Sequence, residues 1–229
     1  MNYGEIVQLG RHRLMCGDAT KYEDIEQLLG GQRVNLVLTD PPYGIKLLGN
    51  GTTGKIGGKT GREYPTVIGD MNTDMAKEHY RIVRTISNRI IIWGGQNFTD
   101  FLPPSCGWIF WDKAKGTDKL SFSDGELAWA NILTRIKKYT LRWNGASCRD
   151  TNMNPFLHPT QKPVELHMRI LEDFTQPDDV ILDCFGGSGT TLIACQLTGR
   201  RCLMMEISPE YCGIITKRYE KLADCPDQP

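Results

Sequence analysis

The chain has 229 residues, of which 24% are charged and 40% apolar, an ordinary composition for a soluble globular protein that excludes the disordered and fibrous classes. Basic and acidic residues number 27 each, so the net charge is zero and any affinity for a nucleic acid must come from local patches. No stretch has the roughly 18 apolar residues of a membrane span, and residues 1–10 lack a secretory signal, so we expect one cytoplasmic domain over residues 1–229.

The first half of the chain alternates strand-like and helix-like segments. Apolar runs predict short strands, and apolar residues at helical spacing predict helices. Residues 44–63 carry many glycines, threonines and lysines without an apolar period, which predicts a long mobile loop. The other expected elements, in chain order, are a strand at 14–16, a helix at 22–29, a strand at 34–38, a helix at 75–87, and strands at 90–93, 108–111 and 127–130.

The second half follows the order strand, Gly-rich turn, helix, strand and acid, which is the βαβ unit of a nucleotide-binding sheet. Pro163 is well placed as the first residue of a helix that ends before a turn at 177–179. The remaining expected elements are a strand at 180–182, a helix at 192–197, a strand at 202–205 that ends in Glu206, and a closing helix that begins at Ser208-Pro209.

Eight cysteines occur in the chain, and none falls in a C-x-x-C pair. Several lie inside apolar, strand-like or helix-like runs, where a reduced cysteine is a small core residue. We therefore expect neither a disulfide framework nor a structural metal.

A glycine turn, Asp183-Cys184-Phe185-Gly186-Gly187-Ser188-Gly189, follows the strand at 180–182. Glycines let the backbone approach a ligand closely, and Glu206 at the end of the next strand can accept both hydroxyls of a ribose. This pairing fits either a dinucleotide or S-adenosylmethionine. A dinucleotide motif would be G-x-G-x-x-G, and the chain has Thr190-Thr191 with no third glycine, which favours S-adenosylmethionine.

A proline turn, Asp40-Pro41-Pro42-Tyr43, follows the strand at 34–38. Ligands of open α/β sheets bind beyond the carboxyl ends of the strands, so we expect the proline turn and the glycine turn to open onto one crevice. An aromatic amine is a poor nucleophile because its lone pair is delocalised. The Asp40 carboxylate and the Pro41 carbonyl can hold such an amine and offset its developing charge, the prolines stiffen the turn, and Tyr43 can stack on an extruded base.

In this order the two turns resemble those of the amino-methyltransferases of DNA, specifically the permuted β group, in which the catalytic motif precedes the cofactor motif. The resemblance covers nearly the whole chain and implies a Rossmann-like S-adenosylmethionine-dependent methyltransferase fold: α/β, with a mostly parallel, doubly wound sheet and a circularly permuted motif order. It implies methyl transfer to the N6 amine of a flipped-out adenine in DNA. Within the group, the chain is similar to small solitary methylases of phages and prophages. Further matching segments are Gly17-Asp18-Ala19, Trp111-Asp112-Lys113, Glu126-Leu127-Ala128-Trp129 and His158-Pro159-Thr160-Gln161-Lys162-Pro163.

The resemblance also implies roles for individual residues. Asp18 and Ala19 would contact the adenine end of the cofactor, and Thr160 and Lys162 its methionine end. Cys184 and Gly186 depart from the common Asp-Pro-Phe-Met-Gly-Ser-Gly, which predicts a more mobile turn and weaker cofactor affinity. The catalytic set is Asp40, Pro41, Pro42 and Tyr43, and the cofactor set is Asp18, Ala19, Thr160, Lys162, Asp183, Phe185, Gly187, Ser188, Gly189, Thr190 and Glu206.

Double-stranded DNA is the expected partner, and residues 113–157 are the expected recognition region. That region is short for a long recognition site, which favours a homodimer. Basic side chains interleaved with Tyr139 and Trp143 suit phosphate contacts, although a solvated basic face is the alternative. The basic residues are Arg135, Lys137, Lys138, Arg142 and Arg149, together with Lys46, Lys55, Lys59 and Arg62 of the expected loop.

Two alternatives to adenine methylation stay open at this point. The first is methylation of the N4 amine of cytosine, although cytosine enzymes of the group more often have Ser where this chain has Asp40. The second is an inactive module that binds DNA or a protein partner, against which the intact Asp40, Tyr43, Gly189 and Glu206 argue. Whether the chain belongs to a restriction-modification system is open as well.

Overall fold

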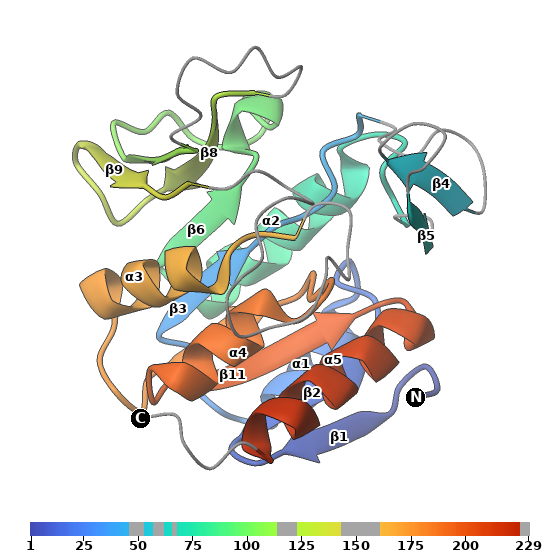
Figure 1. Ribbon diagram of the computed structural model, residues 1–229. Coiled ribbons are helices and arrows are strands. Elements are labelled where there is room, and N and C mark those ends of the chain that lie inside the picture. The colour runs from blue at the N-terminus through green and yellow to red at the C-terminus, as the bar shows by residue number, and fades with distance from the viewer. Residues whose placement is uncertain (46–52, 57–61, 66–67, 114–122, 143–160, 225–229) are drawn as a thin grey trace.

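A nine-stranded sheet forms the centre of the computed structural model, which describes residues 1–45, 53–56, 62–65, 68–113, 123–142 and 161–224 (Figure 1). The strand order is β1-β2-β11-β10-β3-β6-β8-β7-β9. The strands are β1 Ile6–Leu9, β2 His12–Cys16, β3 Leu36–Thr39, β6 Ile90–Trp93, β7 Trp108–Asp112, β8 Gly125–Ala130, β9 Ile136–Thr140, β10 Val180–Asp183 and β11 Arg201–Glu206.

Most neighbouring strands of this sheet are parallel. The run from β2 through β11, β10 and β3 to β6 is parallel throughout, and β7 is also parallel to β9. The antiparallel pairs are β1 with β2, β6 with β8, and β7 with β8. The expected α/β class with a mostly parallel sheet is therefore confirmed.

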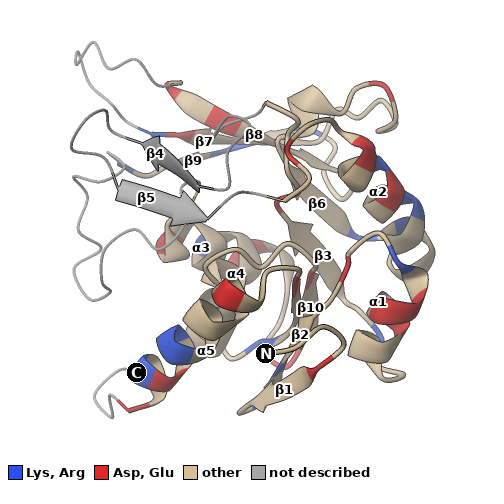
Figure 2. Ribbon diagram, turned by 90° about the vertical axis from the view of Figure 1, so that its right-hand side faces the viewer, with Lys and Arg blue, Asp and Glu red and all other residues tan. Residues whose placement is uncertain are grey.

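Helices cover both faces of the sheet. They are α1 Tyr22–Leu29, α2 Asp74–Ile86, α3 Val164–Phe174, α4 Thr190–Leu197 and α5 Pro209–Ala223. Figure 2 shows α1 and α2 on one side and α3, α4 and α5 on the other. Strand β10 explains the layering, because Ile181 packs into the core beneath α3, α4 and α5, while Val180 and Leu182 pack into the core beneath α1 and α2.

Five cysteines contribute to these cores as buried free thiols, as expected from their apolar surroundings: Cys16, Cys184, Cys195, Cys202 and Cys212. Cys106 is exposed, and Cys148 and Cys225 lie outside the described residues. In the ranges that the structure describes, no helix is long and apolar enough to cross a membrane.

The helix ends follow the capping chemistry of the sequence, with one exception. Ser208 caps α5 by accepting a hydrogen bond from the backbone N–H of Tyr211 at 3.4 Å, and Pro209 is the first helical residue, as expected. Pro163, in contrast, is the N-cap of α3, because its ψ of 137° is extended; the helix begins one residue later than expected.

The expected loop at 44–63 contains strand structure that was not predicted, while its residues 46–52 and 57–61 lie outside the described residues. Strands β4 Thr53–Ile56 and β5 Arg62–Pro65 lie within and just beyond it and pair with each other antiparallel. Backbone hydrogen bonds build this pair, which therefore does not need the apolar period on which the prediction of a loop depended. The edge strands β1 and β9 were also missed; β9 lies inside the basic stretch that was expected to contact DNA.

Candidate active site

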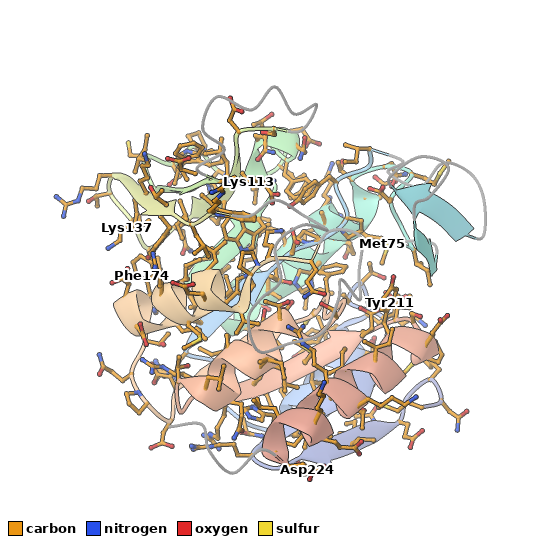
Figure 3. All side chains as sticks on the ribbon, in the orientation of Figure 1. Met75, Lys113, Lys137, Phe174, Tyr211 and Asp224 are labelled. Atoms are coloured by element: carbon orange, nitrogen blue, oxygen red, sulfur yellow. The ribbon has the colours of Figure 1, made fainter. Side chains whose placement is uncertain are left out.

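A cavity opens beyond the carboxyl ends of β2, β3, β10 and β11. The proline turn and the glycine turn line it together, because β3 and β10 are parallel neighbours and therefore end at the same edge of the sheet. Met75 and Tyr211, which Figure 3 labels, line it from α2 and α5. The expected site residues in the lining are Ala19, Asp40, Pro41, Pro42, Tyr43, Lys162, Asp183, Phe185, Gly187, Ser188, Thr190 and Glu206.

Two described residues of the expected cofactor set, Asp18 and Gly189, are not in this lining, and a third cannot be placed. Thr160 lies outside the described residues. Gly189 is the N-cap of α4 with a φ of 84°, a conformation that favours glycine. Asp18 caps its own turn, because its Oδ1 accepts hydrogen bonds from the Thr20 backbone N–H at 2.9 Å and the Thr20 hydroxyl at 2.7 Å. The neighbours Gly17 and Ala19 face the cavity instead.

Glu206 ties the glycine turn to the start of α5. Its Oε2 accepts the backbone N–H of Gly187 at 2.7 Å, and its Oε1 accepts that of Ser208 at 2.9 Å. Burial raises the pKa of Glu206 to about 7, although these two backbone hydrogen bonds lower it. The carboxylate thus orients the turn and remains part of the cavity wall, where it can accept hydroxyl groups.

Asp183, like Glu206, is a buried carboxylate that accepts hydrogen bonds from neighbouring protein groups. Its Oδ1 accepts from the Thr39 hydroxyl at 2.9 Å and the Phe185 backbone N–H at 3.1 Å, and its Oδ2 accepts from the Thr191 hydroxyl at 2.6 Å. Burial raises the pKa of Asp183 to about 7 against these hydrogen bonds. Through these hydrogen bonds Asp183 connects β10 to β3 and α4 beneath the cavity.

Two buried histidines support the site and were missed by the sequence analysis. His79 Nδ1 lies 3.1 Å from the Ala19 carbonyl oxygen, and its ring meets Phe185 edge to face at 5.0 Å. His167 lines the cavity, and its Nδ1 lies 3.1 Å from the Thr191 hydroxyl. Burial lowers the pKa of His79 to about 4 and that of His167 to about 3, so both rings are neutral near pH 7. A single histidine within a helical pattern does not indicate from sequence alone that its side chain will support a site.

The proline turn is held by hydrogen bonds around Asp40. The Tyr43 hydroxyl donates to Asp40 Oδ1 at 2.6 Å, and the Lys162 ammonium donates to Asp40 Oδ2. Lys162 is only 4% exposed. Burial lowers its pKa, but the charges of Asp40 and Glu126 outweigh burial and raise it above its ordinary value. Lys162 therefore meets the proline turn as a buried cation.

Gly94 makes room for Tyr43 beside this network. A Cβ at Gly94 would lie 2.1 Å from Tyr43 Cε1, and the residue has a φ of 71°. The Tyr43 ring packs edge to face against Phe98 at 6.1 Å while still lining the cavity. An aromatic surface is thus fixed beside the Asp40 carboxylate.

The structure describes only some of the basic residues that were expected to contact phosphates. Lys137 pairs with Asp173 at 3.0 Å and Lys138 with Asp112 at 2.8 Å, so local acids compensate both charges on β9. The side chains of Arg149 and of the four basic residues in the expected loop lie outside the described residues. Within the described ranges, no group of three or more His, Cys, Asp or Glu side chains could hold a metal ion.

The pKa of Glu206 leads to a testable effect on stability. Its carboxyl titrates near 4.5 when unfolded and near 7 when folded, so as pH rises between these values its ionisation removes about 3 kcal/mol of folding free energy. Glu206→Gln cannot ionise. The free energy of unfolding of this variant, minus that of the wild type, should therefore rise by about 3 kcal/mol from pH 4.5 to above pH 7 in urea titrations.

The comparison must be between variants, because His79 and His167 act in the opposite direction. Their folded pKa values are lowered, so their contribution to stability is lost as pH falls below about 6.5. A difference between Glu206→Gln and wild type that stays constant over this pH range would show that Glu206 is not perturbed.

Known proteins resemble this chain in sequence and in fold. Residues 111–217 match the N6/N4 family described as DNA methylase. The type II methyltransferase M.HpaI of Haemophilus parainfluenzae is 25% identical over 252 residues, which covers 91% of this chain and 74% of that protein.

Two solved structures share the fold. The M1.HpyAVI–SAM complex aligns with a TM-score of 0.59 and 22% identity, over 90% of this chain and 97% of that one. The PvuII DNA methyltransferase, described as cytosine-N4-specific, aligns with a TM-score of 0.61 and 17% identity, over 97% of this chain and 94% of that one. The nine-stranded sheet and its helices are therefore a fold known from DNA methyltransferases.

Proposed function

We propose that this chain is a DNA methyltransferase of the N6/N4 family and that it transfers the methyl group of S-adenosylmethionine to the exocyclic N6 amine of adenine in DNA. The observation that carries the proposal is the shared cavity. Two turns that lie far apart in the chain line it, one suited to a nucleoside cofactor and the other to an aromatic amine. The match of residues 111–217 to the DNA methylase family supports the same reaction.

The cofactor is S-adenosylmethionine, which M1.HpyAVI binds in its solved complex. When bound, it supplies a methyl group made electrophilic by a sulfonium. The cavity wall suits it: Ala19 and Phe185 offer apolar contact for the adenine, and the Glu206 carboxylate offers acceptors for the ribose hydroxyls. Gly187, Ser188 and Thr190 provide a close backbone and polar groups beside the ribose and methionine parts.

The proline turn prepares the amine of the target base. The Asp40 carboxylate and the Pro41 carbonyl accept its hydrogen bonds, which aims its lone pair into the cavity and offsets the positive charge that grows on nitrogen during attack. The bound cofactor would supply the methyl group to this nitrogen and be left as the neutral thioether, and the proton of the methylated amine would pass to solvent. Tyr43 offers its ring to the extruded base.

The choice of adenine depends on Asp40. The fold itself admits both bases, since the PvuII enzyme is described as cytosine-N4-specific. An Asp at position 40 favours adenine, because the cytosine enzymes of the β group more often have Ser at that position. The order of the turns, with the proline turn first, supports assignment to that permuted group, and the short recognition region favours a homodimer on double-stranded DNA.

Methylation of plasmid DNA with methyl-deuterated S-adenosylmethionine tests the function. Nucleoside mass spectrometry of the digested plasmid should show deuterated N6-methyldeoxyadenosine, and modification-aware sequencing should show one recognition sequence. Labelled N4-methyldeoxycytidine would overturn the choice of base. Cofactor binding without any label in DNA would favour an inactive binding module.

A further inference from the structure

The Lys162 ammonium lies between two carboxylates that come from different parts of the sheet. It donates to Asp40 Oδ2 in the turn after β3, and it lies 3.4 Å from Glu126 Oε2 on β8. The ring of Trp93 lies 5.0 Å from the ammonium, which adds a favourable contact with an aromatic face. Two anionic partners are thus within reach of one buried cation.

Glu126 is ionised in this arrangement. Burial raises its pKa, but the ammonium groups of Lys162 and Lys113 outweigh burial and bring the pKa below its ordinary value. Lys113, labelled in Figure 3, lies 2.7 Å from Glu126 Oε1. The cluster of Lys113, Glu126, Lys162 and Asp40 therefore holds two positive and two negative charges and is neutral as a whole.

The same geometry leaves Asp40 with both oxygens engaged. The Tyr43 hydroxyl donates to Oδ1 at 2.6 Å, and Lys162 donates to Oδ2. Each carboxylate oxygen can accept a second hydrogen bond, but a target amine that binds here must share an oxygen with one of these donors, which weakens its own hydrogen bond. Lys162 is the donor with a second carboxylate in reach, because Glu126 is already 3.4 Å away.

We propose that Glu126 is a positioning residue for methyl transfer: it takes over the Lys162 ammonium when the target amine binds, which frees Asp40 Oδ2 to accept the amine. This inference rests on the proposed function, since it needs an amine at the proline turn. The cation stays paired with a carboxylate throughout the exchange, and Asp40 keeps the Tyr43 hydroxyl and gains the amine as hydrogen-bond donors.

Glu126→Gln tests the exchange, because the amide keeps the shape of the side chain and removes its charge. Among the residues that the structure describes, Asp40 then remains the only anionic partner of Lys162 and holds it more tightly. The rate of methyl transfer should fall about 10- to 100-fold, while the Kd for S-adenosylmethionine stays within about threefold of wild type. Single-turnover rates from nucleoside mass spectrometry measure even strongly slowed variants.

Asp112→Asn is the matched control. Its side chain is 27% exposed, close to the 28% of Glu126, and it pairs with Lys138 at 2.8 Å on the neighbouring strand β7. This variant also removes one ion pair but does not touch Lys162, so its rate should stay within about twofold of wild type.

A double-variant cycle separates positioning from a general structural role. In a Lys162→Met background there is no cation to exchange, so Glu126→Gln should cause no further loss of rate. The inference is overturned if Glu126→Gln leaves the rate unchanged, or if it costs the same factor with and without Lys162. A wild-type protein that binds S-adenosylmethionine but methylates no DNA would instead refute the proposed function.

Discussion

Asp40→Ala is expected to lower the rate of methyl transfer about 1000-fold and to leave the affinity for S-adenosylmethionine nearly unchanged. The Asp40 carboxylate is the charged acceptor that the proline turn presents to the cavity, and the truncation removes it. The glycine turn and Glu206, which are expected to hold the cofactor, have their own hydrogen bonds and do not depend on Asp40. The loss should therefore appear in kcat and not in cofactor binding.

Single-turnover methylation and calorimetric titration with S-adenosylmethionine measure these two effects separately. Asp40→Asn, which keeps the size of the side chain, should also be slow, and the exposed Asp100→Ala should behave as wild type. Thermal denaturation verifies folding, since Lys162 loses the negative charge of Asp40 in the two Asp40 variants but keeps that of Glu126. Turnover at the wild-type rate in Asp40→Ala would refute the role of this carboxylate.

Glu206→Ala is expected to weaken binding of S-adenosylmethionine about 100-fold. The truncation removes the acceptor for the ribose hydroxyls and also leaves the backbone N–H groups of Gly187 and Ser208 without their partner. The first loss weakens ligand binding directly, and the second weakens it by changing the shape of the glycine turn. Each contributes on the order of one charged hydrogen bond.

Calorimetric titration of the DNA-free protein gives this affinity. Glu210→Ala is the control, because Glu210 is an exposed acid in the first turn of α5, only one turn away from the site. A change in Kd of less than about threefold in Glu206→Ala would mean that the ribose lies elsewhere.

Elements with strong local signals could be predicted from the sequence to the residue. The helix at 22–29 and the strand at 90–93 were expected with the bounds that the structure has. The helix at 22–29 has its buried apolar residues at helical spacing and ends at Gly30, and the strand at 90–93 is a continuous apolar run, as expected of a strand buried on both faces. The sequence also predicted that the two turns meet at one cavity, because parallel strands place their carboxyl ends at the same edge of the sheet.

Contacts between distant side chains could not be predicted in this way. The ion pair of Lys162 with Asp40 joins a residue before α3 to one after β3, and no spacing in the sequence encodes it. The same holds for His79, which reaches Ala19 and Phe185 from α2. Strand β9 was missed because its sequence, IKKYT, has two consecutive lysines and no apolar run; ion pairs with Asp112 and Asp173 compensate the charges of these lysines in the fold.

A crystal structure with sinefungin, an S-adenosylmethionine analogue that has an amine in place of the transferable methyl group, tests the shared cavity most directly. The adenine should lie by Ala19 and Phe185, the ribose hydroxyls on Glu206, and the amine should face the proline turn at Asp40. Sinefungin bound outside this cavity, or bound within it with its amine directed away from Asp40, would contradict the proposed function.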